Sequence, residues 1–470
     1  MTAKTHNTID HVVRSLLCTG CGACAGICRY NAITIRENCR GLLTPVINSK
    51  LCIGCGFCFR VCPGQGFDFP AVTKQLFGGY PAHPEIGNFL SIHSGYAVKN
   101  EIRKQCQSGG IVSAVLIHAL ENRIIDGAVV SRWNREDPLN TEVFIARNKD
   151  EILSASGSKY SPVPTAQIIG TLKNTPGRFA FVGVSCQVHA IRNAHQMMPE
   201  LSQKIVFIIG LFCQGTMSHK YLHYALAKAG ICAQDVQRFA YRAKEWRGWP
   251  GDIRIVGKSG NIEHMPSSDR MCAKPYFTPW RCNLCIDKLN EFADFSVGDC
   301  RNPLQYGSKS LKEVNFKGHP GISDIIVRTK AGEGVIKMCL DAGVIELKDS
   351  SWQDLLVSAQ PSRKKLEFTY FAALARILHI GVPSFNIRYI PKNKILNKKL
   401  TRYSSITIVI LFHYWLIEII SGTTMYVFAI KSIPIKILAW LNRVREKGLA
   451  SKNCGPEELI VCRDDEDDIC

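Results

Sequence analysis

Eight cysteines near the N-terminus follow one spacing twice, and this doubled pattern constrains the chain more than any other feature. The first copy reads C-x2-C-x2-C-x3-C, and the second repeats it with a proline after its last cysteine. Three thiolates placed two residues apart can wrap a loop around one face of an iron–sulfur cube, and a distant residue supplies the fourth. Bacterial two-cluster ferredoxins have this spacing. It predicts a ferredoxin-like domain with two 4Fe-4S clusters over residues 1–75.

Cross-ligation is expected in such a run, because the last cysteine of each copy ligates the cluster of the other copy. One cluster is then held by Cys18, Cys21, Cys24 and Cys62, and the other by Cys52, Cys55, Cys58 and Cys28. A pair of zinc knuckles is the alternative, but a zinc site needs only four ligands and does not explain the doubled spacing. Arg29 stands where a proline is usual after Cys28, which leaves the ligands intact.

The chain has 21 cysteines in 470 residues, too many for an ordinary enzyme and too dispersed for a small disulfide scaffold. Residues 1–17 contain no apolar segment typical of a secretory signal. A cysteine-rich chain without a visible secretory signal indicates metal or redox chemistry in a reducing compartment. We therefore expect a cytoplasmic protein. The net charge of +19 favours acidic partners: anionic cofactors, nucleic acid or a membrane surface.

A second set of cysteines lies far apart in the sequence, at Cys186, Cys213, Cys282 and Cys285. The last two form a C-x2-C pair that we expect on a loop over 280–287. The first two follow short apolar strands expected at 181–184 and 205–211. Because cofactors bind at the carboxyl ends of strands in α/β sheets, these four thiolates could hold a third cluster. Buried free cysteines are the alternative, and Cys300 competes for the fourth place.

The other cysteines are interpreted as non-ligands: Cys39, Cys106, Cys232, Cys272, Cys339, Cys454, Cys462 and Cys470. Between the two cysteine sets, the pattern predicts a helix at 111–119 and short buried strands at 127–130, 179–184 and 205–209. Alternating strands and helices indicate an α/β (α+β) multidomain fold. We expect the ferredoxin-like domain to be followed by domains at 90–180 and 181–350 and by a helical, partly apolar extension at 351–470.

Seven short motifs follow one another along the body of the chain. They are Ser108-Gly109-Gly110 before a helix, GSKY at 157–160, VGVSCQ at 182–187, FCQG at 212–215, YR at 241–242 with GW at 248–249, CNLC at 282–285 and ADFSVGD at 293–299. In this order they resemble the family of coenzyme F420 hydrogenase/dehydrogenase beta subunits, in a form with an N-terminal ferredoxin domain. Each motif alone is weak, but the ordered set over residues 18–348 is specific.

The resemblance implies an α/β body that contains FAD, a 4Fe-4S cluster near the flavin, and reaction with coenzyme F420 or a comparable two-electron partner. It places Ser108, Gly109 and Gly110 against FAD, together with Ser158, Lys159 and Tyr160. Glycines before a helix let amide groups meet a pyrophosphate, and a lysine adds a positive charge. The chain departs from the family at Ser185, where a proline is usual, and at Cys300, which follows the last motif directly. No residue stands out as a general acid or base.

These features predict an iron–sulfur flavoprotein oxidoreductase. FAD would exchange a hydride with coenzyme F420 or a similar compound and single electrons with the clusters, because flavin can hold one or two electrons. The redox partner would be a ferredoxin or a hydrogenase or dehydrogenase subunit. Two alternatives remain: a non-catalytic electron-transfer subunit of a larger complex, and a flavin-dependent reductase of a polysaccharide or pigment precursor.

The tail has a different composition from the body. Residues 363–402 are strongly basic, residues 405–430 are mostly apolar, and 464–468 form a short acidic run. The apolar stretch is long enough to span a bilayer, but His413, Glu418 and other residues interrupt it. A core-packed extension, an interfacial helix on anionic lipid and a true span are the alternatives. No motif for reading nucleic acid accompanies the basic residues, so no nucleic-acid partner is expected.

Overall fold

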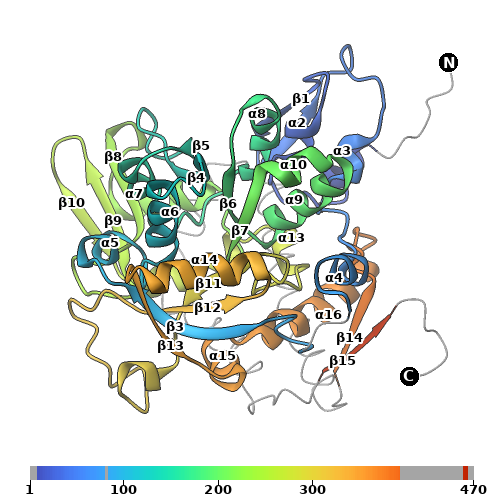
Figure 1. Ribbon diagram of the computed structural model, residues 1–470. Coiled ribbons are helices and arrows are strands. Elements are labelled where there is room, and N and C mark those ends of the chain that lie inside the picture. The colour runs from blue at the N-terminus through green and yellow to red at the C-terminus, as the bar shows by residue number, and fades with distance from the viewer. Residues whose placement is uncertain (1–7, 80–82, 392–458, 464–470) are drawn as a thin grey trace.

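The computed structural model describes residues 8–79, 83–391 and 459–463. At its centre is an eight-stranded mixed sheet with the order β13-β3-β12-β11-β7-β6-β4-β5 (Figure 1). The strands are β3 (Ser91–Ala97), β4 (Gly127–Trp133), β5 (Thr141–Ala146), β6 (Phe179–Val184), β7 (Ile205–Leu211), β11 (Phe295–Asp299), β12 (Ser323–Val327) and β13 (Ile345–Asp349). The four strands β4, β6, β7 and β11 run parallel to one another, so their carboxyl ends meet at one edge. The α/β prediction is confirmed.

Helices cover both faces of this sheet, which is why its central strands are apolar throughout. On one face lie α6 (Ile111–Glu121) and α14 (Lys330–Asp341), and on the other α8 (Ile169–Asn174), α9 (Ser185–Met197) and α10 (Pro199–Lys204) (Figure 1). At the margins lie α5 (Asn100–Gln105), α7 (Lys149–Ser154) and η1 (Thr165–Ile168). The helix predicted at 111–119 and the three predicted strands all lie within observed elements of the same type.

The N-terminal domain contains two similar helical turns, one for each cysteine copy. Its elements are α1 (Ile9–Arg14), α2 (Ala23–Ile27), β1 (Ile33–Glu37), β2 (Leu43–Ile47), α3 (Phe57–Arg60) and α4 (Phe69–Phe77). Gly22 and Gly56 precede α2 and α3 with φ of 84° and 75°, a left-handed conformation that favours glycine. A Cβ on Gly22 would lie 2.8 Å from the carbonyl oxygen of Pro164, so α2 packs closely on the body.

An aromatic contact also joins this domain to the body. Phe67 stacks on His189 of α9, with ring centroids 4.1 Å apart, and meets Phe292 edge-on at 4.8 Å. His189 in turn hydrogen-bonds to the buried Asp287 at 2.9 Å. This hydrogen bond fixes the orientation of the His189 imidazole. Phe67 stacks on the imidazole and Phe292 meets it edge-on. The ferredoxin-like domain is therefore packed on the body and shares its hydrophobic core.

A second, three-stranded sheet has its own core, which the sequence analysis did not predict. It consists of β8 (Val236–Ala243), β9 (Asp252–Gly257) and β10 (Ile262–Met265), with the helices α11 (Lys220–Ala229) and α12 (Ser267–Phe277) and the short η2 (Ala233–Asp235). Tyr221, Tyr241 and Phe277 pack together at the centre of this unit. It lies beside the β4–β5 end of the large sheet (Figure 1) and supplies Arg242 to the cavity described below.

The start of the predicted extension packs into the body. Its elements are α15 (Trp352–Ala359), α16 (Pro361–Ile377) and β14 (Ile387–Pro391), which pairs with β15 (Leu459–Arg463). Lys364 and Lys365 of α16 are only 4% and 1% exposed, and the Lys365 ammonium donates to Glu291 and to the Pro84 carbonyl, both at 2.8 Å. The start of the basic segment therefore packs against the body, in agreement with the core-packed alternative.

The apolar stretch 405–430 and the acidic run 464–468 lie outside the described residues. Within the described ranges, none of the helices combines the length and the apolar character that crossing a bilayer requires.

Candidate functional site

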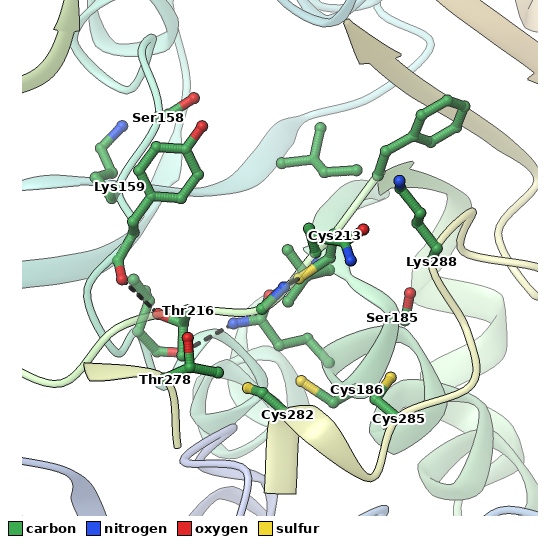
Figure 2. A pocket seen from close by; sticks show the side chains of 18 of the residues that line it. Ser158, Lys159, Ser185, Cys186, Cys213, Thr216, Thr278, Cys282, Cys285 and Lys288 are labelled. Atoms are coloured by element: carbon green, nitrogen blue, oxygen red, sulfur yellow. Dashed lines mark hydrogen bonds between the residues drawn. The ribbon is translucent and has the colours of Figure 1, made fainter. Parts of the chain in front are cut away.

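A cavity of about 1560 Å³ opens at the carboxyl ends of β6, β7 and β11. The four cysteines of the second set gather along one side of it (Figure 2). Cys186 lies in the first turn of α9, directly after β6, and Cys213 comes two residues after β7. Cys282 lies in a four-residue helix, α13 (Trp280–Asn283), where the sequence predicted a loop, and Cys285 follows it. The strand ends thus bring together residues that are a hundred positions apart.

The electrostatics of these thiols favour a cationic group between them. Burial raises the pKa of Cys186 well above its ordinary value, and the charges of Cys21, Cys213 and the C-x2-C pair raise it further. Burial also raises the pKa of Cys282 and Cys285, while the nearby Lys364 ammonium opposes the shift. Because buried thiolates that repel one another are costly, a cationic iron core would stabilise them where an empty cage would not. The donor set fits an iron–sulfur cluster.

Cys300, the competitor for the fourth position, is placed elsewhere. It follows β11 but is fully buried between strands, with its Sγ 3.9 Å from Ser94 Oγ. It does not line the cavity. Two of the cysteines interpreted as non-ligands, Cys39 and Cys106, do line it, and Cys106 lies 3.1 Å from the Ser113 hydroxyl in the first turn of α6.

The cysteines of the N-terminal domain differ in depth. Cys18, Cys21, Cys24 and Cys62 lie on the inner side, and Cys18 lines the cavity. In the other predicted ligand set Cys55 is exposed, and its three companions are partly exposed. No three Cys, His, Asp or Glu side chains among the described residues converge on a position for a single metal ion. The inner set lies toward Cys186, since the charge of Cys21 raises the pKa of the Cys186 thiol.

Arg281 connects the inner set to the C-x2-C pair. Its guanidinium is buried and donates to the carbonyls of Pro63 and Gly64, both at 2.9 Å, and to that of Leu284 at 2.6 Å. The first two carbonyls follow Cys62, and the third precedes Cys285. A planar guanidinium has donors in several directions, so one side chain can fix both segments. Arg281 was not among the predicted site residues, although it directly precedes the C-x2-C pair.

Of the six residues predicted to contact FAD, five line the cavity and Gly109 does not. The Gly109 amide donates to Ser323 Oγ at 3.0 Å, and a Cβ there would lie 2.4 Å from the Gly95 carbonyl oxygen. Gly109 is therefore a packing residue between strands. Gly110, with φ of 81°, starts α6 without a side-chain cap, and the first residues of that helix line the cavity. Free amides at a helix start are well suited to an anion such as a pyrophosphate.

Lys159 has a different environment from the one predicted. Its ammonium donates to the carbonyls of Ala155, Ser156 and Gly157 at 2.6, 3.0 and 2.9 Å. A lysine has three donors, and all three are used here. Lys159 therefore closes the loop after α7, and it has no donor left for a phosphate. Burial lowers the pKa of Lys159 to about 7.

Tyr160 is the cavity residue with the most unusual charge environment. Its hydroxyl accepts a hydrogen bond from Arg242 at 3.3 Å, and the Arg270 guanidinium lies 4.8 Å from its ring centroid. Arg242 also pairs with Asp299 at 2.7 Å. Burial opposes ionisation of the phenol, but the charges of Arg242 and Arg270 outweigh it and lower the pKa of Tyr160 to about 7. Arg242 was not predicted as a site residue, although it belongs to one of the seven motifs.

The Tyr160 phenol should make folding stability depend on pH. Its folded-state pKa is about 7 and its ordinary value is 10.0, so the unfolded chain binds the extra proton between these values. Stability should therefore rise with pH across this window, by roughly 1 kcal/mol per pH unit, and lose this contribution as pH falls through 7. Tyr160→Phe should flatten the rise in thermal unfolding midpoint, whereas the exposed Tyr30→Phe should not. Equal pH profiles for all three proteins would contradict the assignment.

Three family models match parts of this chain. The family model for the C terminus of the coenzyme F420 hydrogenase/dehydrogenase beta subunit matches residues 177–352, and its N-terminal counterpart matches 92–170. A 4Fe-4S dicluster domain model matches residues 17–65. This match favours iron–sulfur clusters over the zinc alternative for the N-terminal domain.

Two relatives found by sequence agree with these matches. The beta subunit of coenzyme F420 hydrogenase from Methanococcus voltae is 29% identical over 272 residues, covering 56% of this chain and 86% of that protein. The beta subunit of the same enzyme from Methanosarcina barkeri is 27% identical over 274 residues, covering 56% and 84%. A chain of the F420-reducing [NiFe] hydrogenase complex from Methanosarcina barkeri aligns at 23% identity with a TM-score of 0.48, over 64% of this chain and 97% of that one. Because the two beta-subunit models together match more than half of its residues, the chain belongs to the family of coenzyme F420 hydrogenase/dehydrogenase beta subunits, which are iron–sulfur oxidoreductase proteins, and it has a 4Fe-4S dicluster domain at its N-terminus.

Proposed function

We propose that this protein is an iron–sulfur flavoprotein oxidoreductase that moves electrons between a two-electron carrier, coenzyme F420 or a similar compound, and a one-electron partner protein. One observation carries the proposal. Cys186, Cys213, Cys282 and Cys285 meet in a large cavity, and Cys21 of the dicluster domain lies near enough to act electrostatically on Cys186.

The three cysteine sets form a sequence from the cavity to the surface. The third cluster would lie at the cavity, the inner cluster of the N-terminal domain next to it, and the outer cluster at the exposed Cys55. Each cluster carries one electron at a time, and burial and nearby charges set its potential. This order would connect the cavity to solvent through the domain that packs on α8 and η1. Arg281 would hold the inner and third ligand sets in register.

The cavity is suited to FAD by size and charge. Its volume of about 1560 Å³ exceeds the usual ~300–1000 Å³ of a site for one small molecule. When bound, FAD supplies the link between two-electron and one-electron chemistry. The amides at the start of α6 would bind its pyrophosphate, and Arg242 would orient the Tyr160 hydroxyl within the same cavity. Gly109 would support this site from outside the cavity, and Lys159 would hold the loop that forms part of the cavity wall.

A surface for the partner surrounds the outer cysteines. Tyr30, Leu51 and Ile53 are 50%, 47% and 63% exposed there, although they are large and apolar. Arg29 and Arg60 lie at the same place, each over the ring of Phe57. Exposed apolar residues next to cations suit an acidic redox protein, since complementary charge speeds docking. Several relatives are named as parts of a hydrogenase, which supports a protein partner.

The proposal is tested by anaerobic purification followed by iron, sulfide and flavin analysis. Three cubes imply about twelve irons per chain, together with about one FAD. The purified protein should then be reduced by reduced coenzyme F420 and reoxidised by an acidic ferredoxin. Protein that keeps its clusters but never binds flavin would favour the alternative of a non-catalytic electron-transfer subunit.

The third cluster has its own test in a cysteine variant. Cys282→Ser with Cys285→Ser should lower the iron content from about twelve to about eight atoms per chain, since only one cube loses its ligands. Cys300→Ser is the matched control, because Cys300 is buried but lies outside the cavity. Iron content that falls with Cys300→Ser and not with the double variant would overturn the ligand assignment.

A further inference from the structure

A buried carboxylate lies directly behind the wall of the cavity. Asp324 is in β12, in register with Ser94 of the neighbouring strand β3. Two residues further along, Ile326 is in register with Ile92, and this face of the sheet packs against Leu355 of α15. Because side chains two residues apart share one face of a strand, Asp324 and Ser94 also lie on the face that α15 covers. Asp324 is 3% exposed, and a charge at such a position is costly unless other groups stabilise it.

The groups that bind this carboxylate are all uncharged. Ser94 donates to Asp324 Oδ1 at 2.9 Å, and Ser358, near the end of α15, donates to Oδ2. The thiol of Cys300 donates to the carboxylate as well. Among the described residues, Asp324 has no ion-pair partner. Neutral donors lower the cost of burying the carboxylate, but they hold it in its ionised form less firmly than a cation would.

The titration of Asp324 suits proton transfer near neutral pH. Burial raises the pKa of Asp324 to about 6, and its hydrogen bonds only partly oppose this shift. The negative charge of Asp299, at the end of β11, raises the pKa further, and Arg301 in turn acts on Asp299. Tyr306 also faces this carboxylate, and burial raises the pKa of its phenol, so it stays neutral. β3 and α15 contribute the two neutral serines. A carboxylate with a pKa in this range is well suited to accept a proton.

Ser358 connects Asp324 to the cavity. It is only 5% exposed, yet it lines the cavity, whereas Asp324 and Ser94 do not. Its hydroxyl donates to Asp324 and accepts a hydrogen bond from the backbone amide of Arg301 at 2.6 Å. A hydroxyl has one donor position and two acceptor positions, so one acceptor position is left for a molecule in the cavity. The Ser358 side chain is therefore fixed in place and can pass a proton from the cavity to the carboxylate.

We propose that Ser358 and Asp324 form a proton relay, which accepts a proton from the two-electron carrier when the carrier is oxidised in the cavity. This inference rests on the proposed function and extends it, because a hydride accounts for two electrons but for only one of the two hydrogens that the reduced carrier gives up. The clusters then carry away electrons and leave the remaining proton behind. The relay provides an acceptor for this proton in the cavity wall.

The transfer is balanced among three groups. The bond between the carrier and its proton breaks as a new bond forms to Ser358 Oγ, and the former hydroxyl proton moves to Asp324 Oδ2. The carrier thereby loses one positive charge, and the carboxylate becomes a neutral carboxylic acid. Ser358 is a neutral hydroxyl before and after the transfer. Once the oxidised carrier has left, the reverse steps return the proton to water in the cavity.

The two serines allow a matched comparison, because both donate to the same carboxylate and only Ser358 lines the cavity. In the holoenzyme mixed anaerobically with reduced coenzyme F420, Asp324→Asn should lower the rate of flavin reduction about a hundredfold, and Ser358→Ala about tenfold or more. Ser358→Thr keeps the hydroxyl and should retain most of the rate, and so should Ser94→Ala. The wild-type rate should fall as pH decreases through about 6, because only the ionised Asp324 accepts a proton, and Asp324→Asn should lose this dependence.

Infrared spectroscopy tests the relay without turnover. A carboxylic acid and a carboxylate absorb at different frequencies, so the difference between the wild-type and Asp324→Asn spectra should contain a carboxylic acid band that disappears as pH rises through about 6. After transfer to D2O, the deuterium shift of this band should be slower in Ser358→Ala than in Ser94→Ala, because only Ser358 joins the carboxyl group to the cavity.

The outcomes separate this inference from the proposed function. Wild-type protein that reduced coenzyme F420 does not reduce would overturn the proposed function itself. Equal loss of rate in Ser94→Ala and Ser358→Ala would show that Asp324 only joins the sheet to α15, and it would overturn the relay while leaving the oxidoreductase proposal intact. An unchanged rate and pH profile in Asp324→Asn would do the same. If Asp324→Asn loses flavin or iron, the comparison of Ser358→Ala with Ser94→Ala decides, in both the rate and the deuterium exchange.

Discussion

Arg281→Met is expected to detach the dicluster domain's inner cysteines from the cavity. The side chain is 4% exposed, and its guanidinium satisfies the carbonyls of Pro63, Gly64 and Leu284. Methionine fills similar space but donates no hydrogen bond, so three buried acceptors lose their partner. Each unsatisfied buried acceptor costs about 1–3 kcal/mol, which makes the expected loss on the order of 3–5 kcal/mol or more. That is a large fraction of the stability of a typical domain.

Two measurements check this prediction: the thermal unfolding midpoint and the iron content per chain. Both should fall, and the iron loss should come from the inner and third clusters, because Cys62 and Cys285 lie beside the freed carbonyls. Arg281→Lys separates charge from geometry, since an ammonium cannot reach both segments as the planar guanidinium does. Arg135→Met, at an exposed position, is the control. An Arg281→Met protein with the wild-type midpoint and full iron content would refute the role of Arg281.

The elements that local pattern determines were predicted well. The span of β6 was predicted to the residue, and the predicted parts of β4, β7 and α6 were confirmed, because short apolar runs bounded by turn residues have few alternatives in an α/β chain. The cysteine spacing likewise identified the dicluster domain, which its family model supports. The convergence of Cys186 and Cys213 followed from one rule: parallel strands end at the same edge of a sheet.

Individual side-chain and backbone contacts, whether local or between distant segments, could not be read in this way. The sequence does not show that the Lys159 ammonium turns back onto its own loop, that Gly109 packs against Gly95, or that Cys300 faces Ser94. The second sheet was also missed. Exposed residues interrupt the buried ones along β8, and β10 is short and mostly exposed, so neither strand has a distinct apolar run. The basic composition after residue 360 left a core-packed extension, an interfacial helix and a span as alternatives. In the structure, Lys364 and Lys365 of α16 are buried and donate to the Cys282 and Pro84 carbonyls and to Glu291.

The resemblance to the family covers residues 18–348, so a chain cut after Lys348 is the natural minimal version, and we expect it not to fold. The cut removes α16, whose buried apolar side chains include Leu366, Ala372 and Leu374. It also removes the buried Phe385. Each fully buried large apolar side chain contributes about 1.5–3 kcal/mol. The cut also removes Lys365, the partner of the buried Glu291, and breaking a buried pair costs about 3–5 kcal/mol. The total, on the order of 10 kcal/mol, matches the whole stability of a typical domain.

The same cut opens the junction with the dicluster domain. Ser384 exchanges backbone hydrogen bonds with Gln65 and Phe67 at 2.9 and 2.8 Å, directly after the last cysteine motif. We therefore expect the chain cut after residue 348 to be recovered as aggregate or with few clusters. A chain cut after residue 391 keeps α15 and α16 and should retain its iron. In the full chain, Lys365→Met removes only the ion pair with Glu291, and it should lower the thermal unfolding midpoint. Soluble protein ending at residue 348 with the full iron content would show that α16 only covers the body and does not stabilise it.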